Sequence, residues 1–385
     1  MFPKLKQALR LFKEQIQYGN FAYQYHFLPI QKNKVVVSSY YGRGYSDNPK
    51  AIVAELLDQG LDIVWLVQNG EEKTLPAGVR HVPYGSKQAL RELATAKIWL
   101  DNCRQKFSPP KRRNQIYIQT WHGPYALKKV EKDAEEQLPI SYVKRAKKDA
   151  RKCDYMLSGS AFCDAMYTDT FWFQGEVLPI GTPRCDVFFQ DNAVIHQRVA
   201  QFFQTEATTR FVTYAPTFRT DGDATVYLQD FTEVQQALQH KYGGTWKVLL
   251  RLHPNVAELA KDINYGENVL NATAYPDMQE LLAASDLLIT DYSSSMFDMM
   301  IAEKKVMLYA PDLESYLKNE RALYFDLKKL PFPLSETQAD LVSQITQFDE
   351  TNYKQQLQHF KQQFGQHETG TASVRIANKI KNWTK

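Results

Sequence analysis

Five short polar clusters hold the residues of this sequence that can do chemistry, and each directly follows a predicted strand. They are Trp121-His122-Gly123-Pro124, Gly181-Thr182-Pro183-Arg184-Cys185-Asp186, Pro216-Thr217-Phe218-Arg219, Arg251-Leu252-His253-Pro254 and Asp291-Tyr292-Ser293-Ser294-Ser295-Met296-Phe297-Asp298. Taken alone, each cluster has an ordinary structural explanation, because a histidine near a strand end is more often a satisfied packing residue. Five clusters at five strand ends are hard to explain as packing, so they indicate a ligand site.

The residue types in these clusters suit a phosphorylated ligand. Ser293-Ser294-Ser295 lie where a predicted strand turns into a helix. A helix N-terminus offers free N–H groups and the positive end of a dipole, which together bind phosphate. Arg184, Arg219 and Arg251 can each present a bidentate guanidinium to phosphate oxygens. Helix capping alone is the alternative explanation for the serines.

Two further residues extend this interpretation. His253 can add a hydrogen bond or a proton, and Asp298 lies about one helical turn beyond the serines, where a carboxylate can accept from ribose hydroxyls. An ordinary surface position on the helix is the alternative for Asp298.

Motifs of several other enzyme classes are missing from the sequence. It has neither the GxxxxGK[ST] phosphate loop nor the GxSxG elbow of serine hydrolases. Asp221-Gly222-Asp223 looks like the DxD that holds a divalent ion in some glycosyltransferases, but Asp and Gly are common in turns for backbone reasons. We therefore expect no obligatory cofactor and no dedicated metal site, with a divalent cation as an option on a pyrophosphate substrate.

Alternating strands and helices must position these clusters. Predicted strands lie at 34–40, 63–67, 96–100, 115–120, 155–158 and 176–179, and the pattern restarts with 210–216, 246–251, 286–290 and 306–309. Repeated strand–helix units predict parallel sheets with helices on both faces. The fold class is therefore α/β, with two doubly wound domains at 1–190 and 191–385 and C-terminal helices that pack back. Ligands of such sheets bind beyond the carboxyl ends of the strands, which predicts a site in the cleft between the domains.

Composition limits the class of protein. The chain has 385 residues, of which 44% are hydrophobic and 23% are charged, as in ordinary globular proteins. It contains no uninterrupted apolar stretch of the roughly 18–20 residues that span a bilayer, and its start lacks the features of a signal peptide. Its 4 cysteines form no CxxC pair, so we expect reduced, buried thiols in a cytosolic protein.

Positive charge is concentrated in one segment. Arg104 to Lys152 contains 14 Lys and Arg but 5 Asp and Glu, a local charge of +9 in a chain of net charge +4. This block suggests an anionic partner, with a solvated helix face as the alternative. Phe2, Leu5, Leu9, Phe12 and Ile16 share one face of a predicted basic N-terminal helix, which suits either a membrane interface or a domain cap.

Together these features resemble the CDP-glycerol glycerophosphotransferase family, the teichoic acid primases and polymerases of Gram-positive envelopes and related capsule or wall-polymer enzymes. The matching segments follow the family's order over roughly residues 120–300: Trp121-His122-Gly123, Gly181-Thr182-Pro183-Arg184, Tyr214-Ala215-Pro216-Thr217-Phe218-Arg219, Arg251-Leu252-His253-Pro254 and Thr290-Asp291-Tyr292-Ser293-Ser294. Weaker similarity extends over most of the chain, including residues 41–49.

The resemblance implies a GT-B fold and transfer of a polyol phosphate, with glycerol phosphate as the first candidate. The donor would be CDP-glycerol or another CDP-polyol, and the acceptor a hydroxyl of a lipid-linked, undecaprenyl diphosphate-type saccharide or polymer, with release of CMP. By this similarity His122 matches the general base, in the acceptor-side, membrane-facing first domain, and the second domain binds the donor. Positions that match donor contacts are Arg184, Pro216, Thr217, Arg251, His253, Ser293, Ser294 and Asp298, and we expect Gly123, Arg219 and Asp291 in the same site. The implied location is cytoplasmic, peripheral on the inner face of the membrane, with no nucleic-acid partner.

Two departures from the family pattern lie near the predicted site. The segment from Trp121 to Lys128 is one residue longer than in many members, and Cys185 stands where asparagine is common. They leave the class intact but leave the polyol and the acceptor open. A GT-B glycosyltransferase that uses a nucleotide sugar is the main alternative, and a polyanion-binding protein leaves the strand-end clusters unexplained.

Overall fold

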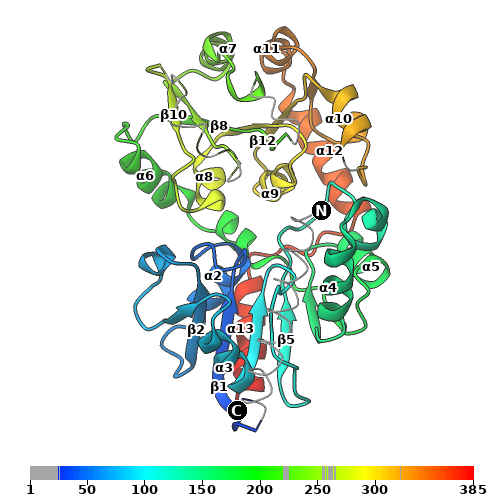
Figure 1. Cartoon of the computed structure of the whole chain (residues 1–385). Helices are drawn as coiled ribbons and strands as arrows, with labels where there is room; N and C mark the ends of the chain where they lie inside the picture. Colours follow the sequence, from blue (N-terminus) through cyan, green and yellow to red (C-terminus); the bar gives the residue numbers. More distant parts are fainter. Residues whose placement is uncertain are drawn as a thin grey trace, which may run out of the picture.

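The structure consists of two α/β lobes stacked one above the other (Figure 1). It is a computed structural model that describes residues 25, 27–219, 225–253, 256, 258, 263, 266–320 and 322–385. The predicted N-terminal amphipathic helix and Asp221-Gly222-Asp223 lie outside these residues. Within them, no helix combines the length and the apolar character that crossing a bilayer requires.

The N-terminal lobe is built on a seven-stranded sheet in the order β3-β2-β1-β4-β5-β6-β7. Its strands are β1 (Gln31–Ser38), β2 (Asp62–Val67), β3 (Arg80–Pro83), β4 (Ala96–Asp101), β5 (Ile116–Gln119), β6 (Tyr155–Leu157) and β7 (Glu176–Leu178), and its helices include α2 (Asp47–Ala54), α3 (Lys87–Thr95), α4 (Ile140–Ala150) and α5 (Ala161–Thr170). Every pairing is parallel, with Val35 opposite both Ile63 and Ile98. The strand order reverses between β1 and β4, which makes that edge the topological switch point.

The C-terminal lobe repeats this plan with six parallel strands in the order β10-β9-β8-β11-β12-β13. The strands are β8 (Arg210–Ala215), β9 (Trp246–Leu250), β10 (Val269–Asn271), β11 (Leu287–Thr290), β12 (Lys305–Tyr309) and β13 (Leu334–Ser335). The helices are α6 (Asn192–Phe202), α7 (Thr232–Tyr242), α8 (Met278–Ala284), α9 (Ser295–Ile301), α10 (Leu313–Asn319), α11 (Gln338–Thr346) and α12 (Glu350–Gln363). Here the order reverses between β8 and β11.

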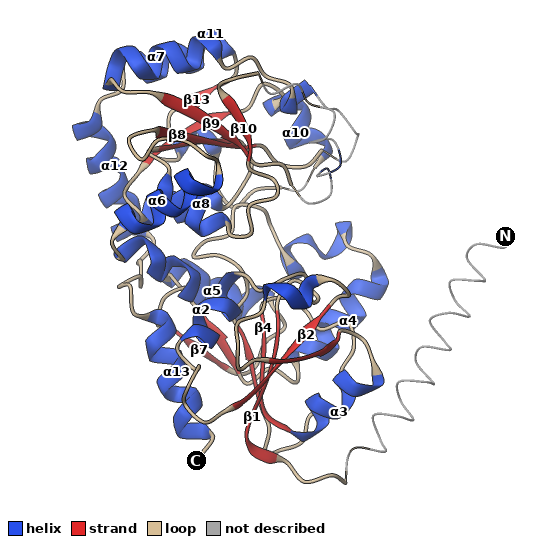
Figure 2. Ribbon diagram, turned by 90° about the vertical axis from the view of Figure 1, so that its left-hand side faces the viewer, coloured by secondary structure: helices blue, strands red, loops and turns tan. Residues whose placement is uncertain are grey.

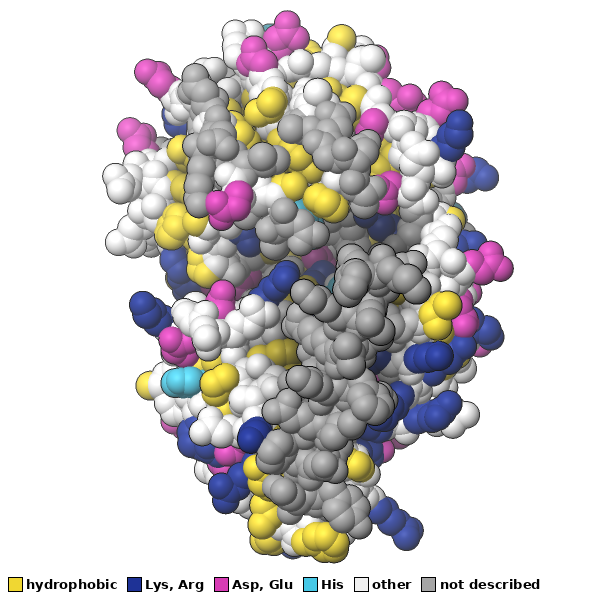
Figure 3. Space-filling model, in the orientation of Figure 1, with side chains coloured by type: hydrophobic (Ala, Val, Ile, Leu, Met, Phe, Trp, Pro, Cys, Tyr) yellow, Lys and Arg dark blue, Asp and Glu magenta, His cyan; other side chains and the backbone are white. Residues whose placement is uncertain are grey.

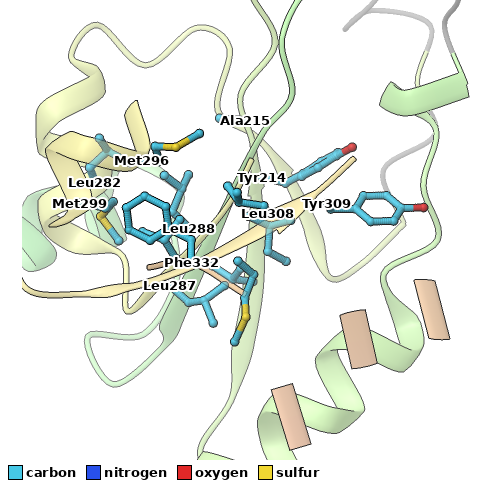
Figure 4. Packing of buried hydrophobic residues seen from close by; sticks show 14 of the residues in the cluster. Tyr214, Ala215, Leu282, Leu287, Leu288, Met296, Met299, Leu308, Tyr309 and Phe332 are labelled. Atoms are coloured by element: carbon cyan, nitrogen blue, oxygen red, sulfur yellow. The ribbon is translucent and has the colours of Figure 1, made fainter. Parts of the chain in front are cut away.

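Buried apolar strands hold each sheet in place. In the C-terminal lobe, Leu287, Leu288 and Leu308 of the central strands pack against Met299 of α9 (Figure 4). Such nearly continuous apolar runs are typical of parallel strands that are covered on both faces. Figure 2 shows the same layering in the lower lobe, where α13 covers one face of the sheet and α3 and α4 lie on the other.

The last helix, α13 (Ala372–Trp383), returns to the N-terminal lobe, where it is the red helix of Figure 1. Ile376 and Ile380 are fully buried in the same cluster as Val35. Asp186, in the segment η3 (Pro183–Phe189) that follows the first sheet, accepts from the N–H groups of Ala372 at 3.0 Å and Ser373 at 2.7 Å. The N-terminal lobe is therefore built from both ends of the described chain.

The predicted α/β class with two doubly wound sheets is confirmed. All ten predicted strands are present, with ends that differ by no more than three residues. The prediction missed β3, β10 and β13, which are short and lie at or near the sheet edges. The four cysteines are buried and unpaired, as predicted.

Candidate active site

The carboxyl ends of both sheets face the junction between the lobes. A Cβ atom built on Gly123, which follows β5, would lie 3.6 Å from a terminal guanidinium nitrogen of Arg184 and 4.0 Å from Oγ of Ser294. Three of the five predicted clusters therefore meet within a few ångströms, although they come from different parts of the chain. Gly123 is suited to this place because its Cβ would lie 3.1 Å from the carbonyl oxygen of Tyr125, which is closer than ordinary van der Waals contact.

His122 is held in a defined orientation at this junction. Its Nδ1 lies 2.9 Å from the carbonyl oxygen of Asn102. A carbonyl can only accept, so Nδ1 carries the proton and the lone pair of the neutral ring is on Nε2. The ring stacks on Trp121 with centroids 4.4 Å apart, and Trp121 has a left-handed backbone with φ of 48°. A strained backbone at a strand end is a frequent feature of functional sites.

The surroundings of His122 favour its neutral form. Burial lowers its pKa below the ordinary value of 6.5, and the nearby Arg184 acts in the same direction. The Asn102 carbonyl and the Asp47 carboxylate oppose this shift. A neutral imidazole with a lone pair on Nε2 is the form that a general base requires.

Arg184 joins the two lobes through carboxylates. One terminal nitrogen donates to Asp47 of α2 at 2.6 Å, and the other donates to both oxygens of Asp298 of α9, at 3.1 and 2.7 Å. Burial raises the pKa of Asp47, but Arg184, the Tyr40 hydroxyl and the Asn48 N–H together bring it below its usual value. Both Arg184 and Asp298, predicted as donor contacts, thus have buried partners inside the protein. Nε of Arg184 is buried and has no hydrogen-bond partner among the described residues.

Asn48 joins two of the predicted clusters, although it was not predicted from the sequence as a candidate site residue. It is fully buried, and its side-chain amide donates to the Trp121 carbonyl at 3.0 Å. Its side-chain oxygen accepts from the backbone N–H of Arg184 at 2.9 Å. Asn48 thereby ties the turn that bears His122 to the segment that bears Arg184. The weak similarity over residues 41–49 was the only signal in the sequence that pointed to it.

Arg219 and Asp291 form a buried ion pair near the ends of β8 and β11. Arg219 donates to Asp291 at 2.8 Å, to Asp312 at 2.7 Å and to the carbonyl of Thr217 at 2.8 Å. Asp291 also accepts from the backbone N–H of Thr217 at 2.9 Å. These contacts occupy the guanidinium that was predicted to meet phosphate, and they fix the loop of the buried Pro216 and the half-buried Thr217 beside β11.

The two predicted serines begin α9. Oγ of Ser293 lies 3.3 Å from the N–H of Ser295 and 2.9 Å from its hydroxyl, so Ser293 caps the first turn. Ser294 is the N-cap residue, and its hydroxyl makes no capping bond. Since both serines are partly exposed, the start of α9 offers hydroxyl groups at the junction.

Arg251 and His253 follow β9 at the same edge. One guanidinium nitrogen of Arg251 donates to the carbonyls of Ala272 and Thr273 at 2.7 and 2.8 Å. Although the His253 side chain is exposed overall, partial desolvation of its ring lowers its pKa, and the charges of Lys128 and Arg43 lower it further. Lys128 and Arg43 belong to the N-terminal lobe, whereas Arg251 belongs to the C-terminal lobe. Cations from both lobes therefore lie near His253.

Two observations concern the position of the candidate site and its capacity to bind a metal ion. A cavity of about 460 Å³ between Tyr227 and Val269 contains none of the predicted site residues and lies at the β9–β10 edge. In the part of the chain that the structure describes, no group of three His, Cys, Asp or Glu side chains is arranged to hold a metal ion.

Two doubly wound lobes whose strand ends meet at their junction make a GT-B-like fold. The chain belongs to the CDP-glycerol:poly(glycerophosphate) glycerophosphotransferase family, whose model matches residues 21–382.

Relatives and a solved structure agree with this family. The chain is 31% identical over 376 residues to a teichoic acid glycerol-phosphate transferase of Staphylococcus aureus, covering 91% of this chain and 93% of that protein. It is 29% identical over 371 residues to the teichoic acid poly(glycerol phosphate) polymerase of Bacillus subtilis, covering 92% of this chain but 49% of the relative, so it spans about half of that protein's length.

The fold matches that of the wall teichoic acid polymerase TagF. The TM-score is 0.84 at 24% identity, and the match covers 100% of this chain and 98% of the other. Another TagF structure, obtained after a soak with CDPG, matches with a TM-score of 0.83 at 25% identity. This likeness confirms the GT-B-like fold that was expected from the sequence.

Proposed function

We propose that this chain transfers glycerol phosphate from CDP-glycerol to a hydroxyl group of a membrane-anchored, lipid-linked acceptor and releases CMP. The product would be a teichoic acid or a related wall or capsular polymer. Family membership and the names of its relatives support the donor and the type of polymer. The observation that carries the proposal is the orientation of His122, whose Nδ1 proton is committed to Asn102 and whose Nε2 is thereby a base.

In the proposed reaction the acceptor hydroxyl attacks the β-phosphorus of CDP-glycerol in line. The new bond joins the acceptor oxygen to this phosphorus, and the bond from phosphorus to the bridging oxygen of CMP breaks. Nε2 of His122 takes the hydroxyl proton. Phosphoryl transfer depends mainly on positioning and charge neutralisation, and a well-placed base adds roughly 10²–10⁴ in rate.

The donor would lie against the strand ends of the C-terminal lobe. We assign its phosphates to the start of α9, with Ser293 and Ser294, and its other contacts to Thr217, Arg251 and His253. Gly123 leaves room for the donor beside Arg184 in this proposal. Asp298, Arg219 and Asp291 then act by holding these groups in place rather than by binding the donor themselves.

Attachment to the inner face of the membrane is part of the proposal. Figure 3 shows Lys and Arg side chains along the flank of the lower lobe that carries α4. Lys144, Lys148 and Arg151 are exposed there, and Ile140 at the start of α4 is 75% exposed. Each basic residue near an anionic surface contributes about 1 kcal/mol. Vesicle flotation tests this part, and binding that is unchanged after neutralising these residues and deleting residues 1–17 would contradict it.

The experiment that tests the reaction is CMP release from a panel of CDP-glycerol, CDP-ribitol and nucleotide sugars, with a lipid-linked acceptor. We expect CDP-glycerol to react and His122→Ala to lower turnover by about 10²–10⁴ with nearly unchanged donor affinity. His240→Ala is the matched control, because His240 is exposed on α7. Turnover of a nucleotide sugar alone would replace this function with glycosyl transfer.

A further inference from the structure

Three cations of the N-terminal lobe lie near one another, and none of them forms an ion pair with a carboxylate in the part of the chain that the structure describes. They are Arg43 in the loop after β1, Lys106 in the loop after β4 and Arg145 on α4, which follows β5. We call them the cationic trio. Their strands β1, β4 and β5 are neighbours, and the sheet's switch point lies between the first two. This is the edge at which an open α/β sheet binds its ligand, and the donor site proposed above uses the corresponding edge of the other sheet.

Two members of the trio lie over tyrosine rings, and one of these contacts joins the loop after β4 to the loop after β1 that also bears Arg43. The ammonium of Lys106 lies 3.7 Å from the ring centroid of Tyr41, and the guanidinium of Arg145 lies 5.4 Å from that of Tyr142. Partial burial, then Arg145 and Arg43, lower the pKa of Lys106. Both arginines are thus close enough to repel this ammonium. Like charges gathered in this way indicate a site for an anion.

Nearby carboxylates are committed elsewhere. Glu131 pairs with Arg104 at 3.1 Å and accepts from the Tyr142 hydroxyl at 2.5 Å. None of the trio forms an ion pair with any described carboxylate. Nε of Arg145 is buried and lacks a hydrogen-bond partner within the described ranges.

The loops after β1 and β4 that bear Arg43 and Lys106 also contact His122, the proposed base. Asn102, whose carbonyl orients His122, lies four residues before Lys106, and the ring of Tyr40 is 6.0 Å from that of His122. Tyr40 and Tyr41 both have left-handed backbones, with φ of 44° and 63°. Such consecutive strained residues are rare and occur mainly where a function requires the geometry. An anion bound by the trio would therefore lie next to the group that deprotonates the acceptor.

We propose that the cationic trio is the acceptor subsite, where a phosphate group of the acceptor binds and brings its hydroxyl to Nε2 of His122. This inference rests on the proposed function, because the ligand is the acceptor of that reaction. The phosphate belongs either to a terminal polyol phosphate unit or to the pyrophosphate of the lipid carrier.

Kinetics with three detergent-soluble acceptors test the proposal. One carries a glycerol phosphate unit on a short alkyl chain, one carries a lipid pyrophosphate saccharide without polyol phosphate, and one has the same terminal hydroxyl but no phosphate. Lys106→Gln and Arg145→Gln should each raise the acceptor KM about tenfold or more for whichever phosphate the trio binds, a loss of about 1.4 kcal/mol. The donor KM should change less than about twofold. Lys73→Gln is the matched control, since Lys73 is exposed on the N-terminal lobe.

A binding measurement separates this from a general loss of activity. Calorimetry with the phosphate-bearing acceptor and CMP-saturated protein should show weaker binding for both variants and unchanged binding for His122→Ala. Equal effects on the phosphate-free acceptor, or acceptor KM values like those of the wild type, would overturn the subsite while leaving the proposed function intact. Absence of turnover with every CDP-polyol would overturn both.

Discussion

At the scale of single residues, the proposed transfer reaction depends on which ring nitrogen of His122 carries a proton. The Asn102 carbonyl settles that question for Nδ1, and burial keeps the ring neutral. Asp47 acts in the opposite direction, since its carboxylate favours the protonated ring. The pKa of the proposed base is therefore a balance between burial and Arg184, which lower it, and the Asn102 carbonyl, Asp47 and Glu131, which raise it.

This balance predicts the pH dependence of the reaction. Protonated His122 cannot take a proton, so kcat/KM should fall on the acid side with an apparent pKa below 6.5. Asp47→Asn removes the charge that favours protonation, so the acid limb should move to still lower pH. A pH–rate profile measures this shift, with Asp58→Asn as the control because Asp58 is exposed and its left-handed φ of 58° suits asparagine. A limb that moves to higher pH would contradict the assignment.

The sequence predicted which residues lie at the junction, but it did not predict which side chains they contact there. His122, Gly123 and Ser294 meet at the junction as their positions after strands predicted. Arg184 and Arg219 were predicted to meet phosphate, but the structure surrounds them with carboxylates. Which charge neutralises a buried arginine depends on contacts between residues more than 70 positions apart, and neither local spacing nor residue type encodes these.

At the scale of elements, the segment between α12 and α13 contains a buried acid. Glu368 is 8% exposed, and both of its oxygens accept from the N–H of Thr182 at 3.0 Å. Burial raises its pKa to about 8, with Asp186 and Asp298 adding to the shift and Thr182 opposing it. The folded protein therefore holds a proton on Glu368 at neutral pH that the unfolded chain releases.

That proton links stability to pH. Between the unfolded pKa of 4.5 and the folded value of about 8, the folded state binds more protons, so the free energy of unfolding should fall as pH rises. Glu368→Gln is neutral at every pH and should give a flatter curve between about pH 5 and 8. Urea unfolding across this range measures the difference. Parallel curves for the two proteins would mean that Glu368 is ionised in the folded state.

The elements that sequence patterns missed share a physical cause. β3, β10 and β13 have 4, 3 and 2 residues, and no more than one residue of each is buried, so a run of buried apolar residues is missing from them. The sequence predicted C-terminal helices that pack back, but it did not predict the cluster of the N-terminal lobe that α13 joins. Its place depends on the cluster that Ile376 and Ile380 join, which contains residues from the opposite end of the chain.

At the scale of the whole molecule, the lobes are tied together at several points around the site. Arg184 bridges Asp47 and Asp298, and Lys50 of α2 pairs with Asp277 at the start of α8 at 2.5 Å. The backbone N–H of Lys129 donates to Ala322 across the junction at 2.8 Å. The proposed base and the proposed donor site therefore keep a fixed relative position, as in-line transfer requires.

Because α13 packs on the N-terminal lobe, we predict that this lobe does not fold from residues 1–190 alone. A chain of residues 1–190 contains all seven strands of the first sheet but lacks the helix that buries Ile376 and Ile380 against it. We expect this chain to show no cooperative unfolding transition, and fusion of residues 366–385 to restore one. In the full chain, Ile380→Ala should lower the free energy of unfolding by about 2–5 kcal/mol. Val374→Ala, at a position of the same helix that is 42% exposed, should change it by less than about 0.5 kcal/mol. Cooperative folding of residues 1–190 alone would mean that the first sheet is stable without α13, and the helix would then serve to join the lobes rather than to complete one.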